Sequence, residues 1–274
     1  NNYQKISPQS FRTSLGTQHL SYGAVYTPFL KTTIAYAYNE KQVEVDQSTG
    51  FKKAKPVSLA ELKKSNPTAY QKIKSHLAKQ YMVLPPSSSV AGIYCQVDRD
   101  RGVWKAPANV SVYGVSGLVS SISQQAQAGL NTDPVSGKSI NTIRTFSGKG
   151  TLVWGSRTLA GNDNEWRYVP VRRLFLTVEE SIQKGTNWAV FEPNNANTWN
   201  NVKAIVEAYL TNLWRQGALV GTTPDKAFYV KVGLGETMTA NEVSNGIMNV
   251  EIGMAVVRPA EFITLTITQQ LSPP

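Results

Sequence analysis

Residues 165–185 read EWRYVPVRRLFLTVEESIQKG, a short aromatic segment followed by a longer amphipathic one. Apolar residues recur at helical spacing through 171–183, and Gly185 is the residue type that commonly follows the last turn of a helix. We therefore expect a helix over 171–183. The segment 165–170 before it favours a strand, so this stretch predicts a strand and helix in succession.

The residues that follow continue the alternation of helix and strand. A second, longer helix is predicted over 199–216, because apolar residues follow one side of it and Gly217 ends it. Strands are predicted at 151–158, 188–192, 228–232, 246–257 and 262–268. The order of these elements predicts an α/β chain, more narrowly an α+β fold of layered mixed sheets with flanking helices.

The last predicted strand, 262–268, has the sequence FITLTIT and carries no charge. Alternation places its aliphatic side chains on one face and three threonines on the other. Such a segment promotes aggregation when it forms an open sheet edge. It either lies inside its own sheet or pairs with a strand of another molecule. The candidates for inter-subunit pairing are Phe262, Ile263, Leu265 and Ile267.

The N-terminal half contains a segment that differs from its surroundings. Residues 20–38 favour strands interrupted at Pro28, whereas 40–80 is polar and predicts helices. Ser58 and Glu61 have the spacing of a capping box, which starts one helix, and a second helix follows. We interpret 40–80 as an inserted, partly helical module.

The net charge of the 274 residues is +10, and positive charge is concentrated in one stretch of this module. Between 52 and 79, eight lysines and one acid, Glu61, give +7. A basic cluster suggests a nucleic-acid, anionic-surface or acidic partner. The cluster lacks arginine and has only Phe51 and Tyr70 as aromatics, whereas base-reading surfaces usually contain both. A solvated basic surface is the favoured interpretation, with a nucleic-acid or anionic-surface binding module as the alternative. The lysines are Lys52, Lys53, Lys55, Lys63, Lys64, Lys72, Lys74 and Lys79.

Catalytic and metal-binding motifs are incomplete. The SGKS at 136–139 resembles the end of a phosphate-binding loop, but Thr132 stands where that loop needs glycine. His19 and His76 are the only histidines, and neither lies in a recognisable catalytic setting. The single cysteine, Cys95, is expected to be a buried small hydrophobe. We predict no enzyme activity, no cofactor and no metal site, and no apolar run is long enough to span a membrane.

Three sequence blocks resemble the contractile tail sheath family. They are LPPS at 84–87 with VAGIY at 90–94 and DRDRGVWKAPAN at 98–109; GTLVWGSRTL at 150–159 with EWRYVPVRRL at 165–174; and EIGMAVVRPAEF at 251–262. The resemblance covers 20–38 and 82–270. It is nearest in character to sheaths of phage-like extracellular contractile injection systems, alongside phage tails and R-type pyocins.

The resemblance implies a structural subunit that polymerises in stacked rings around an inner tube and contracts to drive the tube through a target envelope. The implied partners are further copies of the chain, the tube, and baseplate and cap proteins, assembled in the bacterial cytoplasm. Within the helix at 171–183 and just beyond it, Arg172, Arg173 and Lys184 are candidates for a tube-facing surface. The alternative for the arginines is an ion pair with Glu165, Glu179 or Glu180.

The resemblance also predicts a division into two domains. Residues 1–147 would form the first sheath domain, a region sometimes labelled subtilisin-like but without catalytic residues here, with 40–80 inserted in it. Residues 148–274 would form the C-terminal sheath domain. Because the family has a further N-terminal arm, we expect an N-terminally truncated chain.

Overall fold

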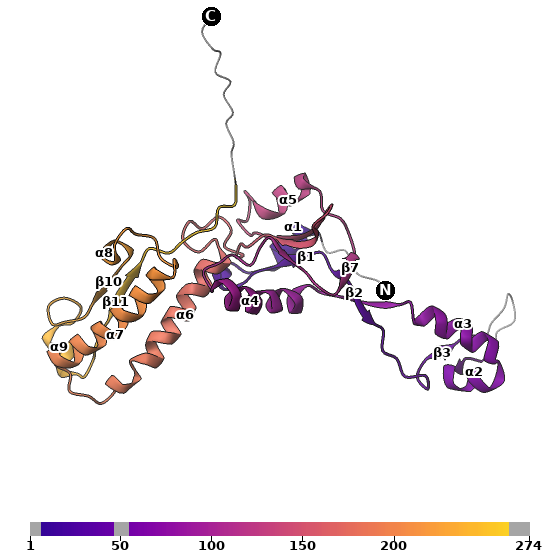
Figure 1. Ribbon diagram of the computed structural model, residues 1–274, viewed down its shortest axis with the longest axis horizontal. Coiled ribbons are helices and arrows are strands. Elements are labelled where there is room, and N and C mark those ends of the chain that lie inside the picture. Colours follow the sequence, from indigo (N-terminus) through magenta and orange to yellow (C-terminus); the bar gives the residue numbers. More distant parts are fainter. Residues whose placement is uncertain (1–6, 47–54, 263–274) are drawn as a thin grey trace, which may run out of the picture.

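The computed structural model describes residues 7–46 and 55–262, which form an elongated molecule of three lobes (Figure 1). A central lobe contains two small sheets. A Lys lobe (residues 36–80) projects from one side of it, and a C-terminal lobe (residues 169–257) with two long helices projects from the other. The mixture of helices and several small sheets agrees with the predicted fold class.

The central lobe has one four-stranded and one three-stranded sheet. The first has the order β1-β8-β9-β6, with β1 parallel to β8 and the other neighbours antiparallel; the second has the antiparallel order β5-β2-β7. The strands are β1 (Tyr26–Thr27), β2 (Leu30–Ala35), β5 (Tyr81–Leu84), β6 (Val110–Ser111), β7 (Val115–Leu118), β8 (Asn141–Phe146) and β9 (Gly150–Trp154). The predicted boundary after residue 147 falls in the turn between β8 and β9, so this sheet continues across it. The division into domains stays a prediction.

Helix α4 (Ser87–Arg101) packs on both sheets of the central lobe. Val90, Ile93 and Val97 recur at helical spacing and form its buried stripe. They share one core with Leu30, Val112, Ile143 and Val153. The VAGIY segment at 90–94 lies within this helix.

The Lys lobe has a small core of its own, formed by Leu59, Leu62 and Tyr70. Its elements are β3 (Glu44–Val45), β4 (Val57–Ser58), α2 (Leu59–Ser65) and α3 (Pro67–Leu77). The predicted capping box is confirmed, since the Ser58 hydroxyl accepts from the Glu61 amide at 3.2 Å and the Glu61 carboxylate accepts from the Ser58 amide at 3.1 Å. The predicted second helix is also confirmed.

The C-terminal lobe packs helices on a two-stranded antiparallel sheet of β10 and β11. Helix α7 contributes Val202, Val206 and Leu210, spaced by one turn, and α6 contributes Leu174 and Val178 to the same core. The elements are α6 (Val169–Gly185), η2 (Asn187–Ala189), α7 (Ala196–Arg215), α8 (Pro224–Ala227), β10 (Phe228–Lys231), α9 (Ala240–Ser244) and β11 (Glu251–Met254). Both predicted long helices are confirmed.

Two predicted strands in this part of the chain are wrong. In 165–170, Asp163 accepts hydrogen bonds from the amides of Glu165 and Trp166, which occupies donors that a strand would need, and α6 already begins at Val169. The segment 188–192 lies in the turn between α6 and α7, where Trp188, Val190 and Phe191 are exposed and only Ala189 is buried. Of 246–257, only β11 is a strand.

The remaining elements are two helices and a 3-10 turn of the central lobe. They are α1 (Pro8–Ser14), η1 (Leu20–Tyr22) and α5 (Gln124–Asn131). Arg12 of α1 is buried, and its guanidinium donates to the carbonyls of Gly129, Leu130 and Lys138, which ties α1 to the end of α5. Within 7–46 and 55–262, no helix is both long and apolar enough to cross a membrane.

Candidate functional site

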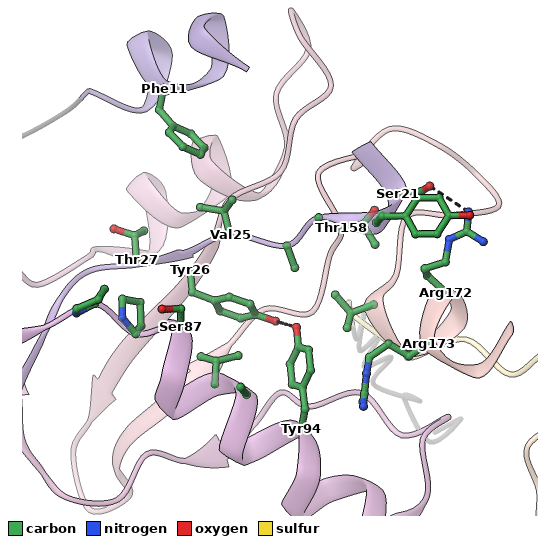
Figure 2. A pocket seen from close by; sticks show the side chains of 18 of the residues that line it. Phe11, Ser21, Val25, Tyr26, Thr27, Ser87, Tyr94, Thr158, Arg172 and Arg173 are labelled. Atoms are coloured by element: carbon green, nitrogen blue, oxygen red, sulfur yellow. Dashed lines mark hydrogen bonds between the residues drawn. The ribbon is translucent and has the colours of Figure 1, made fainter. Parts of the chain in front are cut away.

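A pocket of about 550 Å³ lies where β1, the start of α4 and the start of α6 meet (Figure 2). Its volume is within the range of roughly 300–1,000 Å³ typical of binding sites. The walls are mostly apolar and include Phe11, Val25, Pro28, Pro86, Val90 and Leu176. The polar groups in this pocket therefore decide what it can bind.

Two tyrosines form the polar centre of the pocket. The hydroxyls of Tyr26 and Tyr94 are 2.7 Å apart and hydrogen-bonded (Figure 2). Burial raises the pKa of both phenols above the ordinary value, and that of Tyr26 is raised well above it. Both hydroxyls are therefore neutral around pH 7, and each is available as a hydrogen-bonding group rather than as a base.

Arg173 lies beside this pair and is matched by an acid. Its guanidinium donates to both carboxylate oxygens of Asp98, one at 2.7 Å, and stands 4.7 Å from the ring centroid of Tyr94. The hydrogen bond that Arg173 donates to Asp98 raises the pKa of Arg173. From the sequence, the expected alternative was an ion pair of the arginines with Glu165, Glu179 or Glu180. For Arg173 this prediction is wrong, because its partner is Asp98. Asp98 comes from α4, far away in the sequence.

Arg172 has a different environment. Its guanidinium carbon lies 4.0 Å from the ring centroid of Tyr22 and 3.9 Å from that of Trp166, so the cation is held between two aromatic faces. One terminal nitrogen donates to the Ser21 hydroxyl at 3.2 Å, and the buried Nε has no hydrogen-bond partner. No ion pair joins Arg172 to an acid within the described ranges. The side chain is thus a fixed, uncompensated cation in the wall of the pocket.

The third tube-facing candidate, Lys184, lies near the other end of α6. Its ammonium is 2.6 Å from Glu180, one turn away, and both side chains are largely exposed. The structure therefore does not bring the three candidates together: the two arginines lie at the pocket, and Lys184 lies more than three turns further along the helix. Their role at a tube stays a prediction.

A buried cluster around Glu261 was not predicted from the sequence. Arg157 donates to both oxygens of Glu261, at 2.6 to 3.1 Å, and Asn131 and Tyr168 donate to the same carboxylate. The Arg157 and Glu261 side chains are 6% and 19% exposed. Burial acts to raise the pKa of Glu261, but the hydrogen bonds from Arg157 and Asn131 outweigh it, so the pKa is lowered.

This cluster fixes the chain immediately before the candidate inter-subunit strand. Phe262 follows the clamped residue, is exposed and is not part of a strand. Ile263, Leu265 and Ile267 lie outside the described residues, so the pairing of this segment remains a prediction. Arg157 and Glu261 both lie in sequence blocks that carry the family resemblance. Membership of these blocks is the one sequence feature that could have singled them out.

The lysines of the Lys lobe are exposed wherever the structure describes them. Lys74 pairs with Glu40 at 3.3 Å and contacts the Tyr70 hydroxyl, and Lys63 lies over the Tyr70 ring. Lys55, Lys64, Lys72 and Lys79 are also exposed. Lys52 and Lys53 lie outside the described residues. The structure therefore confirms an exposed basic surface, in which one charge, that of Lys74, is paired with Glu40.

Residues of the incomplete catalytic motifs have structural roles. Lys138, from the SGKS segment, is buried and donates to the carbonyls of Arg12 and Leu15 at 2.7 and 2.6 Å. Its ammonium thus binds the main chain at the end of α1. In the ranges that the structure describes, no group of three or more His, Cys, Asp or Glu side chains could hold a metal ion.

The expectation that Cys95 is buried is wrong. Ile93 and Val97 occupy the buried stripe of α4, and Cys95 between them falls on the exposed side. The apolar run at 90–94, which ends just before Cys95, does not reveal on which face of the helix the next residue lies.

Comparison with known proteins places these features in context. Residues 161–270 match the family described as the phage tail sheath C-terminal domain. The tail sheath protein of Vibrio phage KVP40 is 25% identical over 139 residues, which are 50% of this chain and 20% of that protein.

Two solved structures are more similar to the chain. The sheath complex of an extracellular contractile injection system (PVC), in the contracted state, is 37% identical with a TM-score of 0.73, and the match covers 96% of this chain and 60% of that one. The helical sheath of the anti-feeding prophage (AFP), also contracted, is 48% identical with a TM-score of 0.63, covering 69% of this chain and 52% of that one.

The protein is therefore a homologue of the contractile sheath proteins, which confirms the resemblance seen in the sequence. Among the relatives named here, the PVC and AFP sheaths share more identity with it than the phage sheath does. The chain spans about a fifth of the length of the KVP40 protein and half to two thirds of the two injection-system sheaths.

Proposed function

We propose that the chain is the structural subunit of a contractile sheath, which polymerises around an inner tube and contracts to drive that tube through a target envelope. The observation that carries the proposal is the match of 96% of the chain, at 37% identity, to the contracted PVC sheath complex. The likeness to the AFP helical sheath supports the same role.

The proposed role is mechanical and non-enzymatic. The sheath homology supports it, and so does the structural use of Lys138 in place of phosphate binding. Contraction then draws on two packings of the same subunits and needs no nucleotide hydrolysis. The proposed partners are further copies of the chain, an inner tube protein, and baseplate and cap proteins, within a phage tail or tail-like particle assembled in the bacterial cytoplasm.

Two surfaces are proposed for these partners. Helix α6, with Lys184 exposed and Arg172 and Arg173 at its other end, is the candidate to face the tube. The segment from Phe262 onward is the candidate strand for pairing with a neighbouring subunit. The Glu261 cluster supports that role, because it holds the base of the segment in place.

The test is co-expression of the chain with its tube protein, followed by negative-stain electron microscopy. We expect helical cylinders of sheath around tube. Monomers under all conditions of salt and pH would count against the proposal. Cylinders that shorten only when ATP is added would contradict the mechanism.

The exposed lysines favour a second candidate function, binding of the Lys lobe to an anionic polymer such as nucleic acid. It predicts that log affinity falls linearly with log salt concentration, and that replacing Lys63, Lys64, Lys72 and Lys79 by Ser abolishes binding. A flat salt response would exclude it. The matched control replaces the same number of lysines in the C-terminal lobe by Ser, namely Lys184, Lys203, Lys226 and Lys231.

A further inference from the structure

The turn between α6 and α7 exposes apolar side chains at the far end of the C-terminal lobe. Trp188 is 42% exposed, Val190 59% and Phe191 fully. We call these three residues the apolar tip. Neighbouring Ala189 is buried in the core of the lobe, which fixes the turn. Exposed apolar residues clustered on one turn, unlike single ones, indicate an interaction site.

The backbone of the tip supports this interpretation. Phe191 has a φ of 70°, in the left-handed region that bulky residues rarely adopt. Its side chain is held outward at this conformational cost although it contacts nothing within the described chain that would bury it. Residues kept in such conformations concentrate at functional sites. An acidic residue, Glu192, follows directly; it is exposed and has no ion pair among the described residues.

The pocket at the other end of α6 has the complementary properties. Its walls are apolar and its volume of about 550 Å³ exceeds that of one aromatic side chain. Arg172 supplies a cation that no described carboxylate neutralises, and its Nε lacks a hydrogen-bond partner. The pocket therefore fits a segment that carries an aromatic side chain beside a carboxylate, which is the chemistry of Phe191 and Glu192.

The tip cannot enter the pocket of its own molecule. Arg172 lies in the first turn of α6 and the tip follows its last turn, so the helix holds them about 20 Å apart. Figure 1 shows the turn between α6 and α7 at one end of the molecule, away from the central lobe. A contact between the tip and the pocket can therefore form only between two molecules.

We propose that the apolar tip of one molecule inserts into the pocket of a second copy, with Glu192 beside Arg172. Because tip and pocket are different surfaces, the contact is head-to-tail and propagates into a ring or an open helix rather than closing a dimer. The inference deepens the proposed function, on which it rests, by naming a contact between sheath subunits other than strand pairing.

Cross-linking tests the contact directly. In a Cys95→Ser background, one variant carries Ala91→Cys in the pocket wall and another carries Val190→Cys in the tip, which leaves Phe191 in place. We expect a short bis-maleimide to give heterodimers from the mixture, at least tenfold more than from Ala91→Cys mixed with Val135→Cys, a control at an exposed valine outside the pocket. Equal yields would overturn the proposal, and so would dimers from Val190→Cys alone, which indicate a tip-to-tip contact.

Charge reversal tests the pairing of Glu192 with Arg172. Glu192→Lys in the tip-bearing molecule should lower the cross-linking yield at least fivefold, whereas Glu44→Lys, the same charge change in the distant Lys lobe, should leave it unchanged. Arg172→Glu in the pocket-bearing molecule should restore the yield with Glu192→Lys. If circular dichroism shows that Arg172→Glu is unfolded, the comparison of Glu192→Lys with Glu44→Lys still tests whether Glu192 takes part in the contact.

Assembly separates this proposal from the proposed function. If the unaltered chain forms cylinders with its tube and Phe191→Ser forms them in equal yield, the contact is refuted while the sheath function stands. If cross-links from the tip go to the tube protein and not to the pocket, the tip binds a different partner and the proposal is wrong. If the unaltered chain forms no cylinders, the function fails whatever the cross-links show.

Discussion

The C-terminal part of the chain and the Lys lobe differ in the size of their cores and in the burial of their ion pairs. In the described residues, the core of the C-terminal lobe has eleven buried residues, seven of them from two long helices and a sheet, whereas that of the Lys lobe has three. The C-terminal part also buries an ion pair, Arg157 with Glu261, while the Lys lobe keeps its pair, Lys74 with Glu40, near the surface. The contrast indicates a rigid body carrying a small, locally stabilised appendage.

The largest effect is expected at the buried ion pair. Arg157→Ala leaves the Glu261 carboxylate buried without its cation, so we expect a loss of about 3–5 kcal/mol in the free energy of unfolding. Chemical denaturation measures it. Lys74→Gln, which breaks the exposed pair, serves as the control and should change nothing measurable. Similar losses from both variants would remove the distinction between the two regions.

Truncation of core leucines compares the two lobes directly. Leu210→Ala opens a cavity at a fully buried site in α7 and should cost about 2–5 kcal/mol of global stability. Leu62→Ala in the Lys lobe should instead increase hydrogen exchange over 57–77 and leave the main unfolding transition in place. Hydrogen exchange followed by mass spectrometry measures both. Global destabilisation by Leu62→Ala would show that the lobes unfold as one unit.

Acid titration should give a smaller loss than either substitution. The pKa of Glu261 is lower in the folded chain than in the unfolded one, so its contribution to stability is present above the unfolded pKa and is lost as pH falls through the folded one. Unfolding measured between about pH 3 and 6 should show this decline, and Glu261→Gln should flatten it. Glu44→Gln, at an exposed acid with no ion pair among the described residues, should leave the decline unchanged, and a reversed pattern would contradict the assignment.

The smallest effect is expected at the helix cap of the Lys lobe. Ser58→Ala removes the acceptor for the Glu61 amide and should cost about 1 kcal/mol, confined to α2 and its neighbours. Hydrogen exchange of the first turn of α2 measures it. Ser58→Asp, which keeps a capping oxygen, should retain protection, whereas equal loss in both variants would exclude the cap as the cause.

Sequence reasoning succeeded where the signal is local. The capping box at Ser58, the long helices and the family blocks depend on residues close together in the chain, and each was predicted correctly. It failed for 188–192, because a run of apolar residues does not reveal that the segment is an exposed turn. The pairing of Arg173 with Asp98 was missed for another reason: it joins two helices 75 positions apart, and the spacing of charges within one helix carries no information about it.

The site was predictable only in outline. Arg172 and Arg173 were singled out, but their different environments depend on which neighbours the fold brings to each. Tyr22 and Trp166 enclose Arg172 only because η1 and the turn before α6 meet in three dimensions. The role of Glu261 was equally hidden, because its three hydrogen-bonding neighbours, Asn131, Arg157 and Tyr168, come from three separate segments far from it in the sequence.

The insertion point of the Lys lobe has a practical consequence. Ala35 and Tyr81 pair with each other across β2 and β5, so the lobe begins and ends at adjacent positions on one hairpin. A two-residue turn could close that hairpin in its place, and a foreign domain with neighbouring termini could be grafted there without moving the rest of the chain. The protein thus offers an attachment point at which a dye or a foreign domain could be added.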